Sequence, residues 1–297
     1  MEIQIRAPLD DLWRLTQTPE FHQLWDLRFS EITYLPRPDE SQPQRFLYVT
    51  RIGFGRAVRG EGESMGQRDS PESRTSALRF WSDERMSLIR MGSGYWKYEQ
   101  TGDGARFLTR YGYQTRFGRV GRWFDALIFR PLLGWATAWS FDRLRLWLER
   151  GIDPADSLQR SLVYATARVT LAAVWLYQGL VPKLLVADSG ERDILRSSGL
   201  FPGWERRVLT MVGLLEIGFG ILLVICWHRP RLFLVNVIAL LVLASGALLS
   251  QPSLFNRPFN PATLTVAMIA LSVVGLLSCH DLPTARNCLR ETSGNAQ

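Results

Sequence analysis

The chain has 297 residues, with 35 basic and 28 acidic side chains and a formal net charge of +7. Residues 1–150 hold 23 of the basic and 19 of the acidic residues, so the second half has few charges outside four long apolar runs. This division excludes a single soluble domain, and an apolar content of 46% excludes collagen-like and fully disordered chains. Because the basic residues are dispersed among acidic ones, the positive charge favours a membrane surface over nucleic acid as the anionic partner.

Residues 1–150 predict one α+β domain. The apolar pattern indicates a strand at 3–5 and two short helices within 8–25. Alternating apolar residues then predict a series of antiparallel strands between about 46 and 113. The spacing becomes helical at about residue 120 and stays so to 149, which predicts a long closing helix.

Several short motifs of this domain match a known superfamily. They are Ala7-Pro8-Leu9, Thr18-Pro19-Glu20-Phe21, Leu24-Trp25-Asp26 and, in the closing helix, Phe141-Asp142-Arg143-Leu144-Arg145. Together with the order of elements, they resemble the START-like, polyketide-cyclase-like superfamily, also called SRPBCC. The resemblance implies a helix-grip fold, in which a curved sheet holds the last helix around an apolar cavity for lipids, polyketides or isoprenoids. The superfamily has no common catalytic motif, so no catalytic residue is predicted.

Aromatic residues on the predicted strands are the candidates for lining such a cavity. Because alternating aromatic side chains ordinarily face the interior of a sheet, simple core packing is the alternative for each of them. The candidate cavity residues are Phe46, Tyr48, Phe54, Trp81, Trp96, Tyr111 and Tyr113.

Residues 119–130 join three arginines to several large apolar side chains. This composition suits a helix that lies at an anionic membrane surface. The alternative is that the segment packs wholly onto the sheet, since a closing helix must also cover a core.

Four apolar runs in the second half are long enough to cross a bilayer, because about 20 helical residues span the hydrocarbon core. After a linker at 151–160, we therefore expect an all-α four-helix transmembrane bundle within residues 161–281. A soluble helical core is the alternative, although soluble helices of this length normally retain a polar face. The predicted spans are 162–181, 208–227, 232–250 and 262–279.

Basic residues near the ends of these spans predict the orientation. Six arginines fall on one side of the bundle, whereas the five on the other side are partly offset by acidic residues. The N-terminal residues lack the pattern of a signal peptide. We therefore predict a multi-pass integral membrane protein with both termini in the cytoplasm and residues 282–297 as a cytoplasmic tail.

The membrane half carries recognisable motifs of its own. Tyr177-Gln178-Gly179 precedes Val181-Pro182-Lys183, and Gly213-Leu-Leu-Glu216-Ile-Gly218 and Asn260-Pro261 follow later. Over roughly residues 160–279 the chain resembles the DoxX-like family of small four-helix membrane proteins. Relatives in that family include a subunit of a thiosulfate:quinone oxidoreductase, so the resemblance implies a membrane fold and an association with quinone, but no reaction.

Polar residues inside the first two spans are the candidate ligand site of this half. Arg168, Trp175 and Gln178 recur on one stripe of the first helix, with Tyr177 beside them. An ionisable group in hydrocarbon costs upwards of about 2.5 kcal/mol, so Arg168 and Glu216 of the second helix need partners or water, and we expect them to pair with each other. Such a pair is either a structural lock or part of a site for a quinone headgroup. Lys183 is expected to extend to the outer interface.

Two functions stay open from the sequence. The first is a membrane-anchored protein that binds an apolar ligand, either a lipid, an isoprenoid or a quinone, and exchanges it between the START-like cavity and the DoxX-like bundle. The second is a quinone-interacting subunit of an oxidoreductase complex that needs a separate soluble redox partner. No Walker loop, dinucleotide fingerprint, GxSxG or HExxH motif is present, so we predict no metal and no cofactor other than quinone, and we favour the first function.

Overall fold

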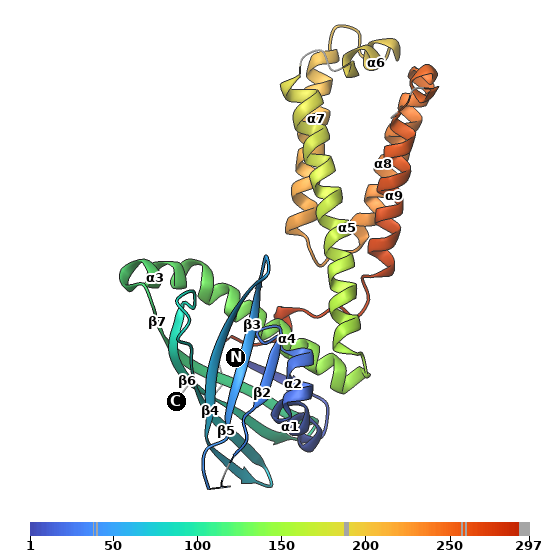
Figure 1. Cartoon of the computed structure of the whole chain (residues 1–297). Helices are drawn as coiled ribbons and strands as arrows, with labels where there is room; N and C mark the ends of the chain where they lie inside the picture. The colour runs from blue at the N-terminus through green and yellow to red at the C-terminus, as the bar shows by residue number, and fades with distance from the viewer. Residues whose placement is uncertain (38, 40, 187–189, 257, 259, 291–297) are drawn as a thin grey trace, which may run out of the picture. The chain divides into compact units, whose positions relative to one another are not determined.

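The computed structural model describes residues 1–37, 39, 41–186, 190–256, 258 and 260–290 (Figure 1). These residues form two compact units. The N-terminal unit is Met1–Ser157 together with the chain from Pro283 onward, and the helical unit is Leu158–Leu282.

The N-terminal unit is built on one antiparallel sheet of seven strands (Figure 1). Its order is β1-β7-β6-β5-β4-β3-β2, so every neighbouring pair except β1 and β7 is consecutive in the chain. The strands are β1 Glu2–Ile5, β2 Glu31–Tyr34, β3 Arg45–Gly53, β4 Arg56–Ser70, β5 Ser73–Trp81, β6 Ile89–Thr101 and β7 Gly104–Thr115.

Helices cover one face of this sheet. Two short helices follow β1, namely α1 Leu9–Gln17 and α2 Pro19–Trp25, and α2 begins with a proline, whose fixed φ suits the first helical turn. After β7 come α3 Gly118–Phe124, the π-helical turn η1 Asp125–Phe129 and the long helix α4 Arg130–Arg150. The core between sheet and helices contains fully buried side chains from α1, α2, β7 and α4, among them Leu12, Trp25, Phe107 and Phe141. This arrangement confirms the predicted antiparallel sheet that grips a closing helix.

The last described residues return to the N-terminal unit. Glu2 and Leu289 exchange two backbone hydrogen bonds of 2.9 and 2.8 Å, and Cys288 is buried in the same core as Phe107. The short 3-10 turn η4 Ala285–Asn287 packs against α4. We predict residues 282–297 to be a cytoplasmic tail, but the part from Pro283 to Arg290 is integrated into the folded N-terminal unit. Residues 291–297 lie outside the described residues.

The helical unit consists of long helices joined by short turns (Figure 1). The long helices are α5 Pro154–Leu180, whose first turn belongs to the N-terminal unit, α7 Glu205–Ile225, α8 Arg231–Ser250 and α9 Pro261–Leu277. The shorter elements are η2 Val181–Leu185, α6 Glu191–Ser197 and η3 Pro252–Asn256. By length and composition, α7 and α8 are candidate membrane spans, and α9 is a shorter apolar helix of 17 residues. The structure therefore gives two clear candidate spans where the sequence predicts four.

Glycines allow α5 and α7 to approach closely. A Cβ atom at Gly179 would lie 2.5 Å from the carbonyl oxygen of Gly213, and one at Gly213 would lie 2.8 Å from the carbonyl oxygen of Gly179. A Cβ atom at Gly220 would lie 3.0 Å from the carbonyl oxygen of Ala172. Small residues at helix crossings of this kind are typical of packing in membranes, where close backbone contact replaces the hydrophobic driving force.

Candidate functional site

The first candidate site is the inner face of the sheet, which we define as the face covered by α4. Side chains alternate along each strand, and the strand registers carry this alternation across the sheet. The inner face includes five of the seven predicted cavity residues, namely Phe46, Tyr48, Trp96, Tyr111 and Tyr113, together with Phe80.

Several inner-face rings lie across glycines of the neighbouring strand. A Cβ atom at Gly60 would come within 2.3 Å of the Tyr48 ring, and one at Gly62 within 2.3 Å of the Phe46 ring. A Cβ atom at Gly92 would come within 2.5 Å of the Phe80 ring. The glycines thus let aromatic rings lie flat on the sheet, which makes this surface broad and apolar.

Two predicted cavity residues do not lie on the inner face. Phe54 is fully exposed at the tip of the β3–β4 hairpin, where its backbone has a φ of 51°. Trp81 follows Phe80 directly on β5 and pairs with Met91, so alternation places it on the opposite face. Those two assignments were wrong because composition reveals neither the hairpin turn nor the phase of the strand.

A buried polar cluster, which the sequence analysis did not single out, borders this inner face. The carboxylate of Asp26, with a side-chain exposure of 0%, accepts hydrogen bonds from Arg28 Nε at 2.9 Å and Nη2 at 2.6 Å, and it lies 3.0 Å from His22 Nε2. Burial by itself would raise the pKa of Asp26, but the guanidinium of Arg28 and the contact with His22 lower it well below its ordinary value. Burial opposes the charge of Arg28 as well, yet Asp26 and the hydroxyl of Tyr111 raise the Arg28 pKa.

The signal for this cluster was present in the sequence. Asp26 ends the Leu24-Trp25-Asp26 motif, and Arg28 follows two residues later, after the end of α2. What the sequence could not give is the burial, because Tyr111 reaches Arg28 from β7, more than 80 residues away.

A second buried acid connects the inner face to η1. Asp125, 1% exposed, accepts a hydrogen bond from the hydroxyl of Tyr113 at 2.6 Å and another from Arg130 Nη2 at 2.7 Å. The π-helical turn carries Asp125 toward β7, and π-turns of this kind are frequent at functional sites. Tyr113 is therefore held at its hydroxyl end while its ring stays on the inner face.

In the helical unit, Arg168 does not pair with Glu216 as predicted. Its guanidinium, 0% exposed, donates to the carbonyl oxygens of Leu223 at 2.6 Å and Cys226 at 2.5 Å and to the hydroxyl of Tyr164 at 2.6 Å. Arg168 therefore caps the C-terminal end of α7, where unsatisfied carbonyl groups and the helix dipole favour a cation. The prediction was wrong because it left out backbone carbonyl groups as partners. The rings of Tyr164, Trp227 and Phe233 lie within 5.4 to 6.0 Å of the guanidinium.

Glu216 pairs instead with Lys183. The Nζ atom of Lys183 lies 3.0 Å from Oε2 of Glu216 and 2.9 Å from Oε2 of Glu191, and it also donates to the carbonyl oxygen of Gln178 at 3.4 Å. The side chains of Lys183 and Glu216 are only 8% and 7% exposed. Lys183 thus points into the helical unit rather than out to an interface, and this buried pair lies beside the Gly179–Gly213 crossing.

The other predicted residues of this half divide between the interior and the surface. Trp175 is buried and donates from Nε1 to Asn236 Oδ1 at 2.6 Å, and Asn236 Nδ2 donates in turn to Ser272 Oγ at 2.7 Å. This chain of hydrogen bonds joins α5, α8 and α9. Sequence reasoning missed Asn236, although a polar residue within an apolar run was a signal for it. Tyr177 is 59% exposed, whereas Trp175 is buried, so the two side chains differ in their surroundings.

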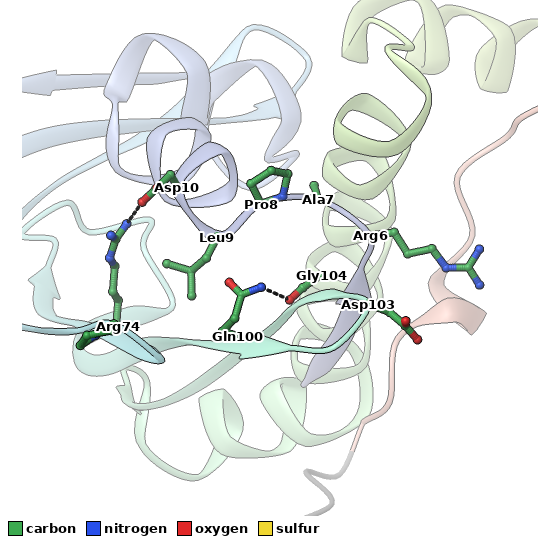
Figure 2. A pocket seen from close by; sticks show the side chains of 10 residues that line it. Arg6, Ala7, Pro8, Leu9, Asp10, Arg74, Gln100, Asp103 and Gly104 are labelled. Atoms are coloured by element: carbon green, nitrogen blue, oxygen red, sulfur yellow. Dashed lines mark hydrogen bonds and ion pairs between the residues drawn. The ribbon is translucent and has the colours of Figure 1, made fainter.

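A surface hollow of about 500 Å³ lies elsewhere on the N-terminal unit, between the start of α1 and the β6–β7 turn (Figure 2). Two pairs of its polar groups interact with one another. Arg74 Nη1 lies 2.7 Å from Asp10 Oδ1, and Gln100 Nε2 donates to the carbonyl oxygen of Gly104 at 3.0 Å. Over the part of the chain that the structure describes, no cluster of three or more His, Cys, Asp or Glu side chains could hold a metal ion.

Comparison with known proteins identifies the family. The chain is 40% identical over 298 residues to the membrane protein YndG of Bacillus subtilis strain 168, and the match covers 98% of this chain and 96% of YndG. The chain belongs to the YndG family. Within it, residues 172–273 match the model of the DoxX-like family, which confirms the predicted resemblance and a membrane location for this half.

Solved structures similar to the chain match its N-terminal half. The di-domain aromatase/cyclase StfQ of the steffimycin biosynthetic pathway is 15% identical with a TM-score of 0.40, and the match covers 51% of each chain. Protein MLL2253 of Mesorhizobium loti is 16% identical with a TM-score of 0.34, covering 50% of this chain and 95% of that protein. Protein SA2116 of Staphylococcus aureus is 11% identical with a TM-score of 0.37, covering 51% and 92%.

Proposed function

We propose that this protein is a membrane-anchored binding protein for an apolar ligand, either a lipid, an isoprenoid or a quinone, which it exchanges between its N-terminal and helical units. The observation that carries the proposal is the incomplete coverage of the inner face. Phe46, Phe80, Tyr111 and Tyr113 are only half-buried there, whereas Phe107 in the adjoining core is completely buried. Aromatic surface of this kind, next to a few fixed polar groups, is typical of a site for a small apolar molecule.

The polar groups at this face would orient the ligand. Arg28 is held by Asp26 and interacts with Tyr111, so the polar end of a ligand would meet a fixed cation and a hydroxyl. The rings of Phe46 and Phe80 would contact the apolar body. The ligand we expect therefore has one polar head and an extended apolar portion.

We also propose that the helical unit crosses the membrane four times, through α5, α7, α8 and α9, with both termini in the cytoplasm. The return of Pro283–Arg290 to the N-terminal unit supports an even number of crossings, because the chain before and after the helical unit then belongs to one folded body on one side of the bilayer. α5 has 27 residues and α9 has 17, or about 40 and 25 Å of helix at 1.5 Å per residue, which suffices for two further crossings beside α7 and α8.

The test of binding is mass spectrometry of small molecules retained by the full chain after purification in mild detergent. Two neighbouring residues of β5 provide a matched pair of variants, since Phe80 lies on the inner face and Trp81 on the opposite face. We expect a co-purifying apolar molecule that Phe80→Ser loses and Trp81→Ser keeps. Equal retention by both variants, or no molecule enriched over a mock purification, would refute binding at the inner face.

One observation favours the second function, a quinone-interacting subunit of an oxidoreductase complex. The buried Lys183–Glu216 pair places a cation and a carboxylate together inside the helical unit, where a quinone headgroup could exchange hydrogen bonds and a proton with them. In the same mass spectrometry, this function predicts a quinone that survives Phe80→Ser and is lost in Lys183→Met. A soluble partner would then supply the electron-carrying cofactor.

A further inference from the structure

One end of the N-terminal sheet gathers three connections that are distant in sequence. Because consecutive strands are antiparallel, the β3–β4 hairpin, the β5–β6 loop and the start of α3 after β7 all leave the sheet at the same end (Figure 1). The registers Gly53↔Arg56, Trp81↔Met91 and Ile89↔Thr115 fix this placement. We call it the loop end of the sheet, and it comprises residues 51–56, 82–88 and 116–128.

Two phenylalanines at the loop end have unusual backbone conformations. Phe54 has a φ of 51° and Phe117 a φ of 66°, and their exposures are 104% and 58%. The left-handed region is unfavourable for bulky residues and is normally occupied by glycine or asparagine. An exposed aromatic ring in such a position buries little apolar surface within the unit, which makes it a candidate for contact with something outside the unit.

The helical part of the loop end is equally apolar on its outer side. Gly121 and Asp125 face the sheet and are buried, while Val120, Trp123 and Leu127 are 74%, 63% and 59% exposed. The segment therefore does not pack wholly onto the sheet. Its outer face is an unpartnered apolar surface continuous with Phe117.

Positive charge surrounds these apolar side chains. Acidic residues of the loop end are fewer, and Glu84 already lies 3.7 Å from Arg59. The exposed arginines of the loop end are Arg51, Arg56, Arg85, Arg119 and Arg122.

We propose that the loop end is a docking surface for an anionic bilayer, in which Phe54 and the outer face of α3 enter the headgroup region and the arginines bind lipid phosphates. Apolar side chains ringed by arginine match the chemistry of such a surface, because the apolar side chains enter the headgroup region and each arginine is attracted to the anionic lipids. The N-terminal unit is also tethered closely to the membrane half, since only Gly151–Asp153 separate α4 from α5. This inference rests on the membrane location and not on the proposed ligand.

The experiment measures how deeply a label at the loop end enters the bilayer. The full chain, with Cys226, Cys279 and Cys288 replaced by alanine, receives a bimane label at Val120→Cys. A label at Asp103→Cys, in the β6–β7 turn at the opposite end of the sheet, is the control. Both proteins are reconstituted into vesicles of equal parts phosphatidylglycerol and phosphatidylcholine that contain nitroxide-labelled lipid. We expect quenching at position 120 to exceed that at 103 by at least about threefold.

Two further variants test the contributions of the ring and the charges. Phe54→Asn relieves the unfavourable backbone conformation, so it should not destabilise the fold, yet we expect it to reduce quenching at position 120 by at least about half. Arg119→Gln combined with Arg122→Gln should reduce it similarly, and so should vesicles of phosphatidylcholine alone.

Three results would overturn the proposal. The first is equal quenching at positions 120 and 103. The second is quenching at 120 that is insensitive to both Phe54→Asn and the arginine variants. The third is a blue-shifted but unquenched label, which would mean that a protein surface rather than lipid covers the loop end. Retention of a ligand by the full chain would be unaffected by any of them, so the two proposals fail separately.

Discussion

Asp142 should control the attachment of the C-terminal segment Pro283–Arg290 to the N-terminal unit. Its carboxylate, with 0% exposure, accepts hydrogen bonds from the backbone N–H of Thr284 at 2.8 Å and from Asn287 Nδ2 at 2.9 Å. It also forms an ion pair with Arg145, whose Nε lies 2.7 Å away. Asp142→Ala removes both hydrogen bonds to the segment at once.

The size of the effect follows from these contacts. Hydrogen bonds to a charged group contribute about 1.5–3 kcal/mol each, and two that share one carboxylate are not fully additive. We therefore expect Asp142→Ala to destabilise the attached state by about 2–4 kcal/mol, which raises the fraction of detached segment about 30- to 1,000-fold.

Cys288 provides the assay, because it lies on the segment and is 7% exposed. Burial raises the pKa of its thiol to about 12, so the attached segment reacts extremely slowly with a maleimide near neutral pH. With Cys226 and Cys279 replaced by alanine, the labelling rate reports detachment. Asp142 also raises the Cys288 pKa, so rates at several pH values separate the loss of that charge from detachment.

Arg145→Met is the matched control, since it breaks the same ion pair but leaves the hydrogen bonds to Thr284 and Asn287. We expect it to change the labelling rate by less than about fivefold. If Asp142→Ala labels Cys288 no faster than this control, the segment is not held by Asp142, and the backbone pairing of Leu289 with Glu2 is what attaches it.

Three other predictions follow from the two units. Lys183→Met removes the cation that pairs with both Glu216 and Glu191, so it should destabilise the helical unit in detergent by about 3–5 kcal/mol. Glu216→Gln should cost less, because Lys183 retains Glu191. The double variant should show a coupling energy of at least about 1 kcal/mol, and strictly additive losses would contradict the pair. The folded-state pKa of Asp26 is lowered, so the stability that Asp26 contributes is complete above its unfolded pKa of about 4 and is lost as the pH falls toward the folded value. Asp26→Asn should therefore make stability, monitored by circular dichroism, depend less on pH in that range. An unchanged unfolding curve would count against the cluster. Reporter fusions in the loop after α8 and at the C-terminus should report opposite sides of the membrane, and agreement between them would exclude four spans with cytoplasmic termini.

Much of the architecture could be predicted from local pattern. The change from alternating to helical spacing near residue 120, the apolar runs at α7 and α8, and the motifs around Gln178 and Glu216 each depend on residues close together in the chain. Such signals survive folding because strand alternation, helix periodicity and the length needed to cross a bilayer are local properties. They indicated both the gripped sheet and the DoxX-like half.

The partners of the buried charges could not be predicted in this way. Arg168 and Glu216 stand as the obvious opposite charges within apolar runs, yet tertiary contacts give Arg168 the carbonyl groups that end α7 and give Glu216 the ammonium group of Lys183. Free backbone carbonyl groups at a helix end have no sequence signature. They become partners only when the fold brings a side chain of another helix, here Arg168 of α5, next to that end.

The sequence by itself predicted the alternation of the antiparallel sheet, the closing helix and the apolar runs at α7 and α8, because each of these depends on spacing along the chain. Only the tertiary structure decided that Phe54 lies at an exposed turn, that Trp81 faces away from Phe80's surface, and that the segment around Cys288 returns to pair with β1. The phase of a strand reverses with a shift of one residue, and a contact between Glu2 and Leu289 closes a loop of nearly the whole chain. Neither leaves a trace in local composition, since both depend on the free energy of the complete fold.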